Sequence, residues 1–289
     1  MTAPSPDSPT ALDDLVALLD LEAIEVNLFR GVSPDENRQR VFGGQVAGQA
    51  LIAAARTVDP ERQVHSLHAY FLRPGDPNVP ILYDVDRIRD GRSFTTRRVV
   101  AIQHGRAIFN LQASFHVLEP GPEHQQEMSD VPPPEELPDF KTRMEPHAER
   151  MGEWYHRPRP IDLRYVDDDP FSRQGKTATR QRVWLRADGS LPDDPALHAC
   201  VVTYASDMTL LDTTLLPFGL QWTEAGIQMA SLDHAMWFHR SFRADEWLLY
   251  QQEAVSTGAA RGLASGGIFT RDGRLVVNVV QEGLARFPR

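Results

Sequence analysis

Hydrophobic and polar positions repeat along this chain with two different periods. Apolar side chains at steps of three and four predict a helix from Pro195, a favoured first helical residue, to about Leu211. An alanine-rich run behind the turn Gly43-Gly44 predicts another helix over residues 46–57. Predicted strands follow each helix, near residues 65–72, 81–89, 93–104 and 106–116, and near residues 233–242, 247–256, 262–270 and 274–282. A helix followed by several strands is typical of an antiparallel α+β unit and not of the β-α-β order of a parallel sheet.

The two units also resemble each other in sequence. Shifted by 167 positions, the residues Phe71, Arg73, Leu82, Tyr83 and Gly91 fall on Phe238, Arg240, Leu249, Tyr250 and Gly258. One residue is then inserted, and at a shift of 168 the hairpin turn at Gly105 falls on the turn at Gly273. Because the matches include turn glycines and the apolar runs beside them, we interpret the chain as a duplication of one unit.

Prolines concentrate between the two units. Residues 120–170 hold ten of the 22 prolines of the chain, a density typical of a linker. We therefore predict an N-terminal repeat at residues 1–118, a proline-rich linker at residues 119–170 and a C-terminal repeat at residues 171–289.

Composition limits the partners of the protein. The 30 basic and 40 acidic side chains give a net charge of −10, which argues against a nucleic-acid-binding surface. No apolar run approaches the roughly 20 residues of a membrane span, and the N-terminus lacks the basic and apolar regions of an export signal. A single cysteine, Cys200, excludes an intrachain disulfide. We expect a cytoplasmic protein without a nucleic-acid or membrane partner.

Several common reactive motifs are absent from the sequence. There is no Gly-x-Ser-x-Gly elbow of a serine hydrolase, and one cysteine cannot form a structural zinc cluster. His65 and His68 are three residues apart on a predicted strand, so they lie on opposite faces and cannot share a metal ion. We expect neither a metal nor a cofactor.

One carboxylate interrupts the apolar face of the second predicted helix. The face consists of Leu197, Cys200, Val201, Tyr204, Met208 and Leu211. Asp207 lies on the same face, so its carboxylate is expected to point to the core or to a cavity beside it, where an unpaired charge costs several kcal/mol. The alternative is that the helix bends or ends near Asp207 and the carboxylate forms local hydrogen bonds.

Two further polar residues stand out. Gln281 shares one strand face with Leu275, Val277 and Val279 and is its polar member. A buried glutamine needs partners for its amide group and its carbonyl, which a carboxylate and a bound water would provide; backbone groups at a sheet end are the simpler alternative. Ser231, just before a predicted strand, is a weaker candidate, since serines there usually form turns.

The repeat alignment changes the weight of these three candidates. In the first unit Asp207, Ser231 and Gln281 correspond to Arg40, Val64 and Ala113, although the helices align poorly. The polar set therefore occurs in the second unit alone, as expected when a duplicated site is retained once.

Five segments carry a resemblance to a known family. They are residues 41–46 (Val-Phe-Gly-Gly-Gln-Val), 70–76 (Tyr-Phe-Leu-Arg-Pro-Gly-Asp), 204–207 (Tyr-Ala-Ser-Asp), 232–240 (around Leu-Asp-His and Met-Trp-Phe-His-Arg) and 280–283 (Val-Gln-Glu-Gly). In these the chain resembles the acyl-CoA thioesterase II family. The resemblance implies an α+β double hotdog, in which each of two tandem repeats wraps an antiparallel sheet around a long helix.

The resemblance also implies a reaction and its residues. An Asp, a Thr and a Gln of the family orient a hydrolytic water, and the matching positions are Asp207, Ser231 and Gln281, with Ser in place of Thr. Acyl-CoA is then the substrate, with Asp207 as general base and the other two fixing the water. A backbone N–H at Gly44 is a candidate for polarising the thioester carbonyl. Because hotdog units usually pair edge to edge, we expect further assembly into a homo-oligomer.

Three alternatives remain open at this stage. Asp193 and His198 have the five-residue spacing of a hotdog enoyl-CoA hydratase, but the asparagine expected between them is missing. A non-catalytic acyl-CoA-binding module is the second alternative, and His65 acting as the base is the third.

Overall fold

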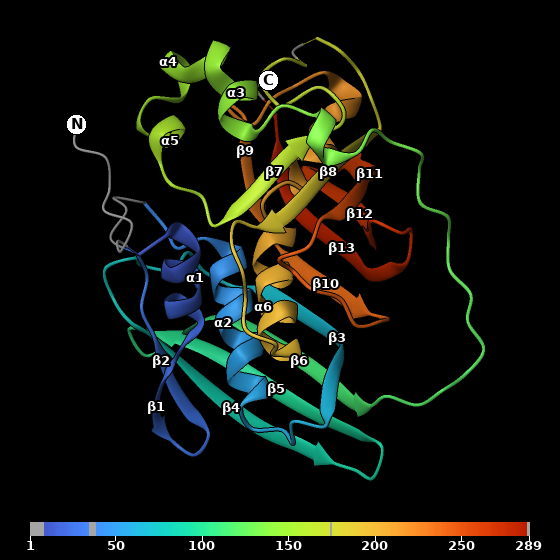
Figure 1. Cartoon of the computed structure of the whole chain (residues 1–289). Coiled ribbons are helices and arrows are strands. Elements are labelled where there is room, and N and C mark those ends of the chain that lie inside the picture. Colours follow the sequence, from blue (N-terminus) through green and yellow to red (C-terminus); the bar gives the residue numbers. More distant parts are fainter. Residues whose placement is uncertain (1–8, 35–38, 174, 288–289) are drawn as a thin grey trace.

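The computed structural model describes residues 9–34, 39–173 and 175–287 (Figure 1). Their strands form one antiparallel sheet in the order β1-β2-β4-β5-β6-β3-β10-β13-β12-β11-β8-β7, with β9 paired to β13 outside this path. The strands are β1 (Glu22–Glu25), β2 (Leu28–Gly31), β3 (Arg62–Phe71), β4 (Ile81–Asp90), β5 (Phe94–Gln103), β6 (Arg106–Val117), β7 (Ile161–Tyr165), β8 (Arg180–Ala187), β9 (Gln228–Ser231), β10 (Asp233–Phe238), β11 (Leu248–Gly258), β12 (Arg261–Thr270) and β13 (Leu275–Arg286).

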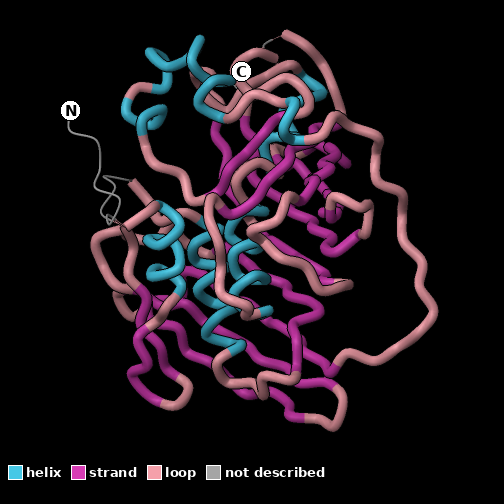
Figure 2. The backbone as a smooth tube through the Cα atoms, viewed as in Figure 1, coloured by secondary structure: helices cyan, strands magenta, loops and turns pink. Residues whose placement is uncertain are grey.

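Two long helices lie against each other beside this sheet. The α-helices are α1 (Ala11–Leu19), α2 (Gly43–Ala55), α3 (Phe140–Met144), α4 (Ala148–Met151), α5 (Glu153–His156) and α6 (Pro195–Ser206), and the 3₁₀ helices are η1 (Pro134–Glu136), η2 (Glu145–His147) and η3 (Leu211–Phe218). Helices α2 and α6 pack side by side, and Figure 2 shows both of them surrounded by strands of the two halves. Small buried residues of α2, among them Ala47, Gly48 and Ala50, permit the close approach. This arrangement is the predicted α+β double hotdog.

The register at the centre of the sheet reflects the duplication. Strands β3 and β10 pair where the two halves meet, and His68 lies opposite Ala235. The shift of 167 that aligns the repeats carries His68 onto Ala235 itself. It also carries the pair Leu67 and Met236 onto the pair His234 and Ala69. A pseudo-two-fold axis therefore passes through this seam, and it relates α2 to α6.

The end of α6 corrects one prediction. We expected this helix to continue to about Leu211, but it ends at Ser206 with Asp207 as its C-cap. The apolar spacing continues beyond because residues 211–218 form the 3₁₀ helix η3, whose three-residue period also keeps one face buried. The helix ends near Asp207, as the alternative stated, but the carboxylate is buried, as we expected, and is bonded by Gly44, Ser231 and Gln281 on other elements and not by local groups.

The region between the predicted repeats is more structured than its prolines indicate. Residues 119–170 contain η1, η2, α3, α4 and α5, and β7 within them pairs with β8. The paired region of the second half therefore begins before residue 171. Strand β7 alternates buried and half-buried residues over only five positions, too short a signal to stand out among prolines. No helix of the described residues is long and apolar enough to cross a membrane.

The seam between the halves generates a prediction about fragments. Residues 1–118 expressed alone keep β6 beside β3 but lose β10 on its other side and α6 against α2, which exposes a sheet edge and an apolar helix face. We expect this fragment to be insoluble or to lack a cooperative thermal transition, while the full chain melts cooperatively under the same conditions. A monomeric fragment with cooperative melting would contradict the pseudo-dimer.

Candidate active site

Asp207 lies where the end of one long helix meets the start of the other. It caps the C-terminus of α6, and the Gly44 N–H in the first turn of α2 donates a hydrogen bond to its carboxylate. A Cβ atom at Gly43 would lie 2.7 Å from Asp207 Oδ2, and one at Gly44 would lie 2.4 Å from the carbonyl oxygen of Tyr204. Only glycine at both positions lets the carboxylate reach the start of α2.

The other two predicted residues meet Asp207 from neighbouring strands. Gln281 on β13 is fully buried and donates from Nε2 to Asp207 Oδ1 at 2.6 Å. Ser231, the last residue of β9, donates from Oγ to the same oxygen at 3.3 Å, which is long for a hydroxyl donor. Strand β9 pairs with β13, and Ser231 lies opposite Gly283. The structure therefore brings together the three side chains that the sequence singled out.

One polar atom of this cluster has no partner. Since a carboxylate only accepts hydrogen bonds, the Gln281 amide must turn its NH₂ group to Asp207 and its oxygen away. Gln281 Oε1 is buried and has no hydrogen-bond partner among the described residues. The cluster thus contains an acceptor next to the carboxylate that a small hydrogen-bond donor would satisfy.

Burial dominates the electrostatics of Asp207. It raises the pKa of this carboxyl from 3.8 to about 6, although the bonds from Gln281, Gly44 and Ser231 and the positive charge of Arg40 act in the opposite direction. The helix dipoles oppose each other here, because the N-terminus of α2 favours the negative charge and the C-terminus of α6 disfavours it. At neutral pH Asp207 is mainly ionised, with a pKa in the range that suits a general base.

The position of Arg40 corrects the repeat alignment. We aligned Arg40 with Asp207, but Arg40 lies near Asp207 in the same site. The residue at the C-cap of α2, equivalent to Asp207 at the C-cap of α6, is Arg56. The shift of 167 fails here because the segments between helix and strand differ in length, although it holds along the strands.

Three nearby residues complete the surroundings of Asp207. His234 is buried and hydrogen-bonded to Ser206 Oγ at 2.8 Å, and burial lowers its pKa to about 4, so it is neutral. Asp233 accepts the Glu282 N–H at 2.7 Å, as expected of a structural residue. Burial raises the pKa of Asp212 to about 7, against the charge of Arg173, which lowers it, and with a smaller contribution from the charge of Asp207. Asp212 lies on η3 beyond the predicted helix, where no sequence pattern marked it as a candidate.

The alternative residues lie elsewhere. His65 bonds Ser114 Oγ at 2.8 Å, and its ring contacts Phe94 and His116 on the first half of the sheet. Asp193 and His198 lie at the start of α6, at the end opposite Asp207. There Asp193 pairs with Arg243 and His198 accepts the Ala244 N–H. None of these residues contacts Asp207.

In the part of the chain that the structure describes, no group of three or more His, Cys, Asp or Glu side chains is arranged to hold a metal ion.

Known proteins resemble this chain over nearly its whole length. Two family models match, one for acyl-CoA thioesterase at residues 160–284 and one for the acyl-CoA thioesterase N-terminal domain at residues 33–116. Human acyl-coenzyme A thioesterase 8 is 43% identical over 94% of this chain and 88% of its own. An acyl-CoA thioesterase II from Mycobacterium marinum is 47% identical, covers 95% of this chain and 98% of its own, and has a TM-score of 0.79. A hot dog fold protein from Alicyclobacillus acidocaldarius, 20% identical over 96% of this chain and 99% of its own, has a TM-score of 0.78 and shares the fold. The chain therefore belongs to the acyl-CoA thioesterase II family and is a thioester hydrolase with a double hotdog fold.

Proposed function

We propose that this enzyme hydrolyses acyl-CoA by direct attack of one water held by Asp207, Ser231 and Gln281. The observation that carries the proposal is the buried cluster itself. An ionised carboxylate with a pKa of about 6 lies beside a buried acceptor, Gln281 Oε1, and a hydroxyl that reaches Asp207 over 3.3 Å. A water between these groups finds an acceptor for each of its protons and a donor or acceptor in Ser231.

The reaction balances without a covalent intermediate. Asp207 removes a proton from the water while the water oxygen attacks the thioester carbonyl carbon, which is already electrophilic. The carbon–sulfur bond of the tetrahedral intermediate then breaks, and the proton on Asp207 passes to the leaving CoA thiolate. The products are a free fatty acid and CoA, and Asp207 is ionised again.

The first turn of α2 supplies a backbone donor, the Gly44 N–H, for the thioester carbonyl. The Gly44 N–H bonds the ionised Asp207, so in the resting enzyme Gly44 positions the base. As Asp207 takes the proton of the water, it becomes a weaker acceptor while the carbonyl oxygen becomes negative. We expect the Gly44 N–H to move toward that oxygen at this moment, in the manner of an oxyanion hole at a helix start.

An apolar space for an acyl chain lies close to Asp207. A cavity of about 150 Å³ is lined by Met208 and Thr209, which directly follow Asp207. Its other walls are mainly apolar or aromatic and include Phe140, Trp154, Phe171 and Trp222. The helices of residues 119–170 contribute to this wall, which gives this segment a role in enclosing the substrate.

The geometry favours hydrolysis over the alternative functions. A hydratase would use Asp193 and His198, but Asp193 is 96% exposed and bound to Arg243, while His198 is buried. A binding module has no need of a buried carboxylate whose ionisation costs free energy. Acyl-CoA hydrolysis is the function that uses Asp207.

The proposal extends to the state of the enzyme in the cell. A buried free Cys200 fits a reducing cytoplasm.

Exposed apolar side chains on the first half, among them Tyr70 at 57% and Leu72 at 45%, support assembly of copies into a homo-oligomer. Light scattering of the purified chain at micromolar concentration is expected to give a mass of at least two chains. A monomer mass across the concentration range would contradict the assembly.

Removing the base tests Asp207. We expect Asp207→Asn to lower turnover about 10²- to 10⁴-fold, since the variant cannot accept the proton of the water. In the wild type, turnover should fall as the pH drops below about 6, because the protonated carboxyl is no longer a base. Thiol release from acyl-CoA between pH 5 and 9 measures both effects. Asp86→Asn, which removes an exposed carboxylate of β4 that pairs with Arg98 and lines neither cavity, is the matched control and should retain turnover.

The same raised pKa has a consequence for stability. The pKa of Asp207 is higher in the folded protein than in the unfolded chain, so the folded state binds the proton more tightly. The stability that this proton binding adds to the fold is therefore fully present below pH 4 and is lost as the pH rises through about 6. The melting temperature of Asp207→Asn relative to the wild type is therefore expected to increase between pH 4 and 8. For the activity test above, an Asp207→Asn variant that folds normally and hydrolyses acyl-CoA at the rate of the wild type would remove Asp207 from the mechanism.

Substitutions of Ser231 distinguish a catalytic role of its hydroxyl from a structural one. If Ser231 holds the water, Ser231→Ala should lower turnover about tenfold to a hundredfold, the equivalent of roughly 1–3 kcal/mol, with little change in acyl-CoA affinity. Ser231→Thr keeps the hydroxyl and should keep turnover. If Ser231 only forms a turn, alanine lowers the melting temperature and leaves turnover per folded molecule unchanged. Turnover and melting of the three proteins decide between these outcomes.

A further inference from the structure

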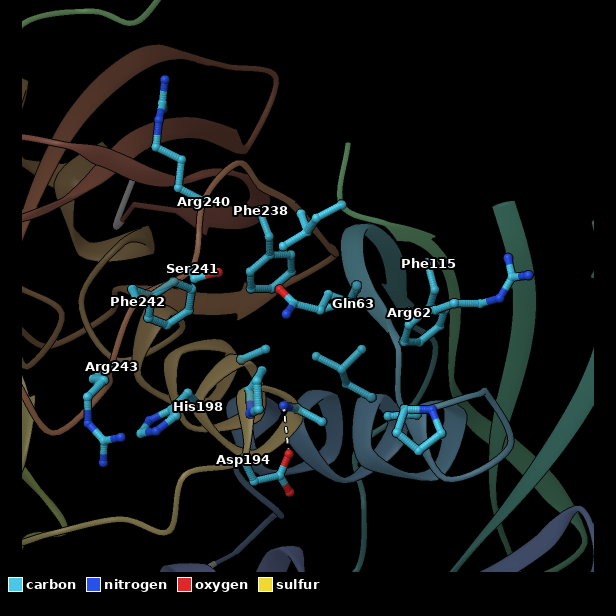
Figure 3. Close-up of a pocket in the computed structure, with 18 of the residues that line it drawn as sticks. Arg62, Gln63, Phe115, Asp194, His198, Phe238, Arg240, Ser241, Phe242 and Arg243 are labelled. Carbon is cyan, nitrogen blue, oxygen red and sulfur yellow. Dashed lines mark hydrogen bonds between the residues drawn. The ribbon is translucent and has the colours of Figure 1, made fainter. Parts of the chain in front are cut away.

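A second, larger cavity lies at the opposite end of the two long helices from Asp207. Its volume is about 870 Å³, within the range of small-molecule sites. The end of α2 and the start of α6 form its floor, and β3, β6 and the segment after β10 form its walls. Figure 3 shows Gln63 and Phe238 pointing toward each other across it, with Phe242 and His198 on one side and Phe115 on the other.

The pseudo-two-fold axis relates this cavity to the hydrolytic site. Arg56, the C-cap of α2, is equivalent to Asp207, and Val64 on β3 is equivalent to Ser231. Both Arg56 and Val64 line the cavity. The equivalent of Gln281 is Ala113, a buried residue of β6 paired to Leu67. The cavity is thus the counterpart of the hydrolytic site, and none of the three water-holding groups is present in it.

The lining combines an apolar interior with a charged rim. Apolar walls come from Leu51, Ile52, Val64, Phe115, Phe238 and Phe242. The rim carries the arginines Arg56, Arg62, Arg240, Arg243 and Arg274 and the acids Asp59, Asp193, Asp194 and Glu246.

One of these arginines, Arg274, is held by an ion pair that is exposed on both sides. Arg274 is 55% exposed and pairs with Asp272, which is 67% exposed, whereas Arg240 is 18% exposed and bonds both Glu123 and the Leu275 carbonyl. An exposed ion pair such as that of Arg274 with Asp272 contributes about 0–1 kcal/mol, so a phosphate can replace the Asp272 carboxylate at small cost. An apolar chain with a phosphate-bearing head matches this distribution.

A buried donor in the same wall also lacks a partner. The Ala244 N–H donates to His198 Nδ1 at 3.0 Å, so the ring proton resides on Nε2. His198 is 2% exposed, and its Nε2 has no hydrogen-bond partner among the described residues. A ligand carbonyl oxygen is an acceptor of the kind this donor needs.

We propose that this cavity is a second acyl-CoA site, which binds the thioester without hydrolysing it. The acyl chain lies among the aromatic side chains, and a CoA phosphate meets Arg274 at the rim. Arg56 stands at the position equivalent to Asp207, so no carboxylate lies where the hydrolytic site holds its base. The proposal rests on the proposed function for the class of ligand, and its test separates the two.

The experiment counts bound ligands. Isothermal titration with S-octyl-CoA, a thioether that cannot be hydrolysed, is done below its micelle concentration on the full chain. We expect two molecules per chain for the wild type. Gln63→Trp fills the centre of the cavity and is expected to bind one molecule, with kcat/KM for octanoyl-CoA within about twofold of the wild type. Val255→Trp, at a strand position that is 53% exposed and does not line the cavity, is the matched control and should bind two.

A second variant guards against a folding defect. Ser241 lies in the exposed segment after β10 and lines the cavity, so Ser241→Trp narrows it without burdening the core. This variant should also bind one molecule and hydrolyse normally. One molecule per chain in the wild type, or two in both cavity variants, would overturn the second site. Loss of hydrolysis in both folded variants would also overturn it, because the cavity would then belong to the hydrolytic site.

The count is independent of the hydrolytic mechanism. If the chain binds two thioethers but hydrolyses no acyl-CoA, the proposed function fails and the second site stands. If it hydrolyses acyl-CoA but binds one thioether, the second site fails and the proposed function stands.

Discussion

The structure depends on one carboxylate placed between two helix ends. Asp207 terminates α6 and at the same time accepts the Gly44 N–H at the start of α2. The contact requires that α2 begin with Gly43 and Gly44, since a Cβ atom at either position would collide with its surroundings. Burial raises the pKa of the carboxyl to about 6, and three hydrogen bonds keep it low enough for the base to be ionised at neutral pH. Packing of the two repeats and the chemistry of the site therefore share a single contact.

The duplication explains why there is one such contact. A pseudo-two-fold axis through the β3–β10 seam creates two equivalent places, each at the C-terminus of one long helix and the N-terminus of the other. Asp207 occupies one place and Arg56 the other. The fold needs both helix ends, but hydrolysis needs one carboxylate. The second place therefore keeps a cavity but holds an arginine where the first holds the base.

Much of this arrangement follows from the sequence alone. The strands predicted near residues 81–89 and 262–270 lie at Ile81–Asp90 and Arg261–Thr270, because regular alternation and hairpin glycines define them well. Asp207 and Gln281 were found as polar residues on apolar faces, and the structure places them 2.6 Å apart. Short elements without a clear period, such as β7 and β9, were not found.

The errors have a common physical cause. Apolar residues at steps of three and four do not distinguish an α-helix from an α-helix that passes into a 3₁₀ helix, so the end of α6 was placed too late. The alignment that paired Arg40 with Asp207 assumed loops of equal length in both repeats. Local patterns specify which residues belong to an element, whereas the point at which a helix stops is decided by tertiary contacts such as that between Asp207 and α2.

The central claim, that Asp207 activates a water and does not itself attack the thioester, is tested most directly by isotope labelling. A single turnover of acyl-CoA, with enzyme in excess, is carried out in ¹⁸O-labelled water and the products are analysed by mass spectrometry. The account predicts one ¹⁸O atom in the fatty acid from the first turnover and none in the peptide that contains Asp207. An unlabelled fatty acid together with ¹⁸O in that peptide would show an acyl-enzyme on Asp207 and contradict the account.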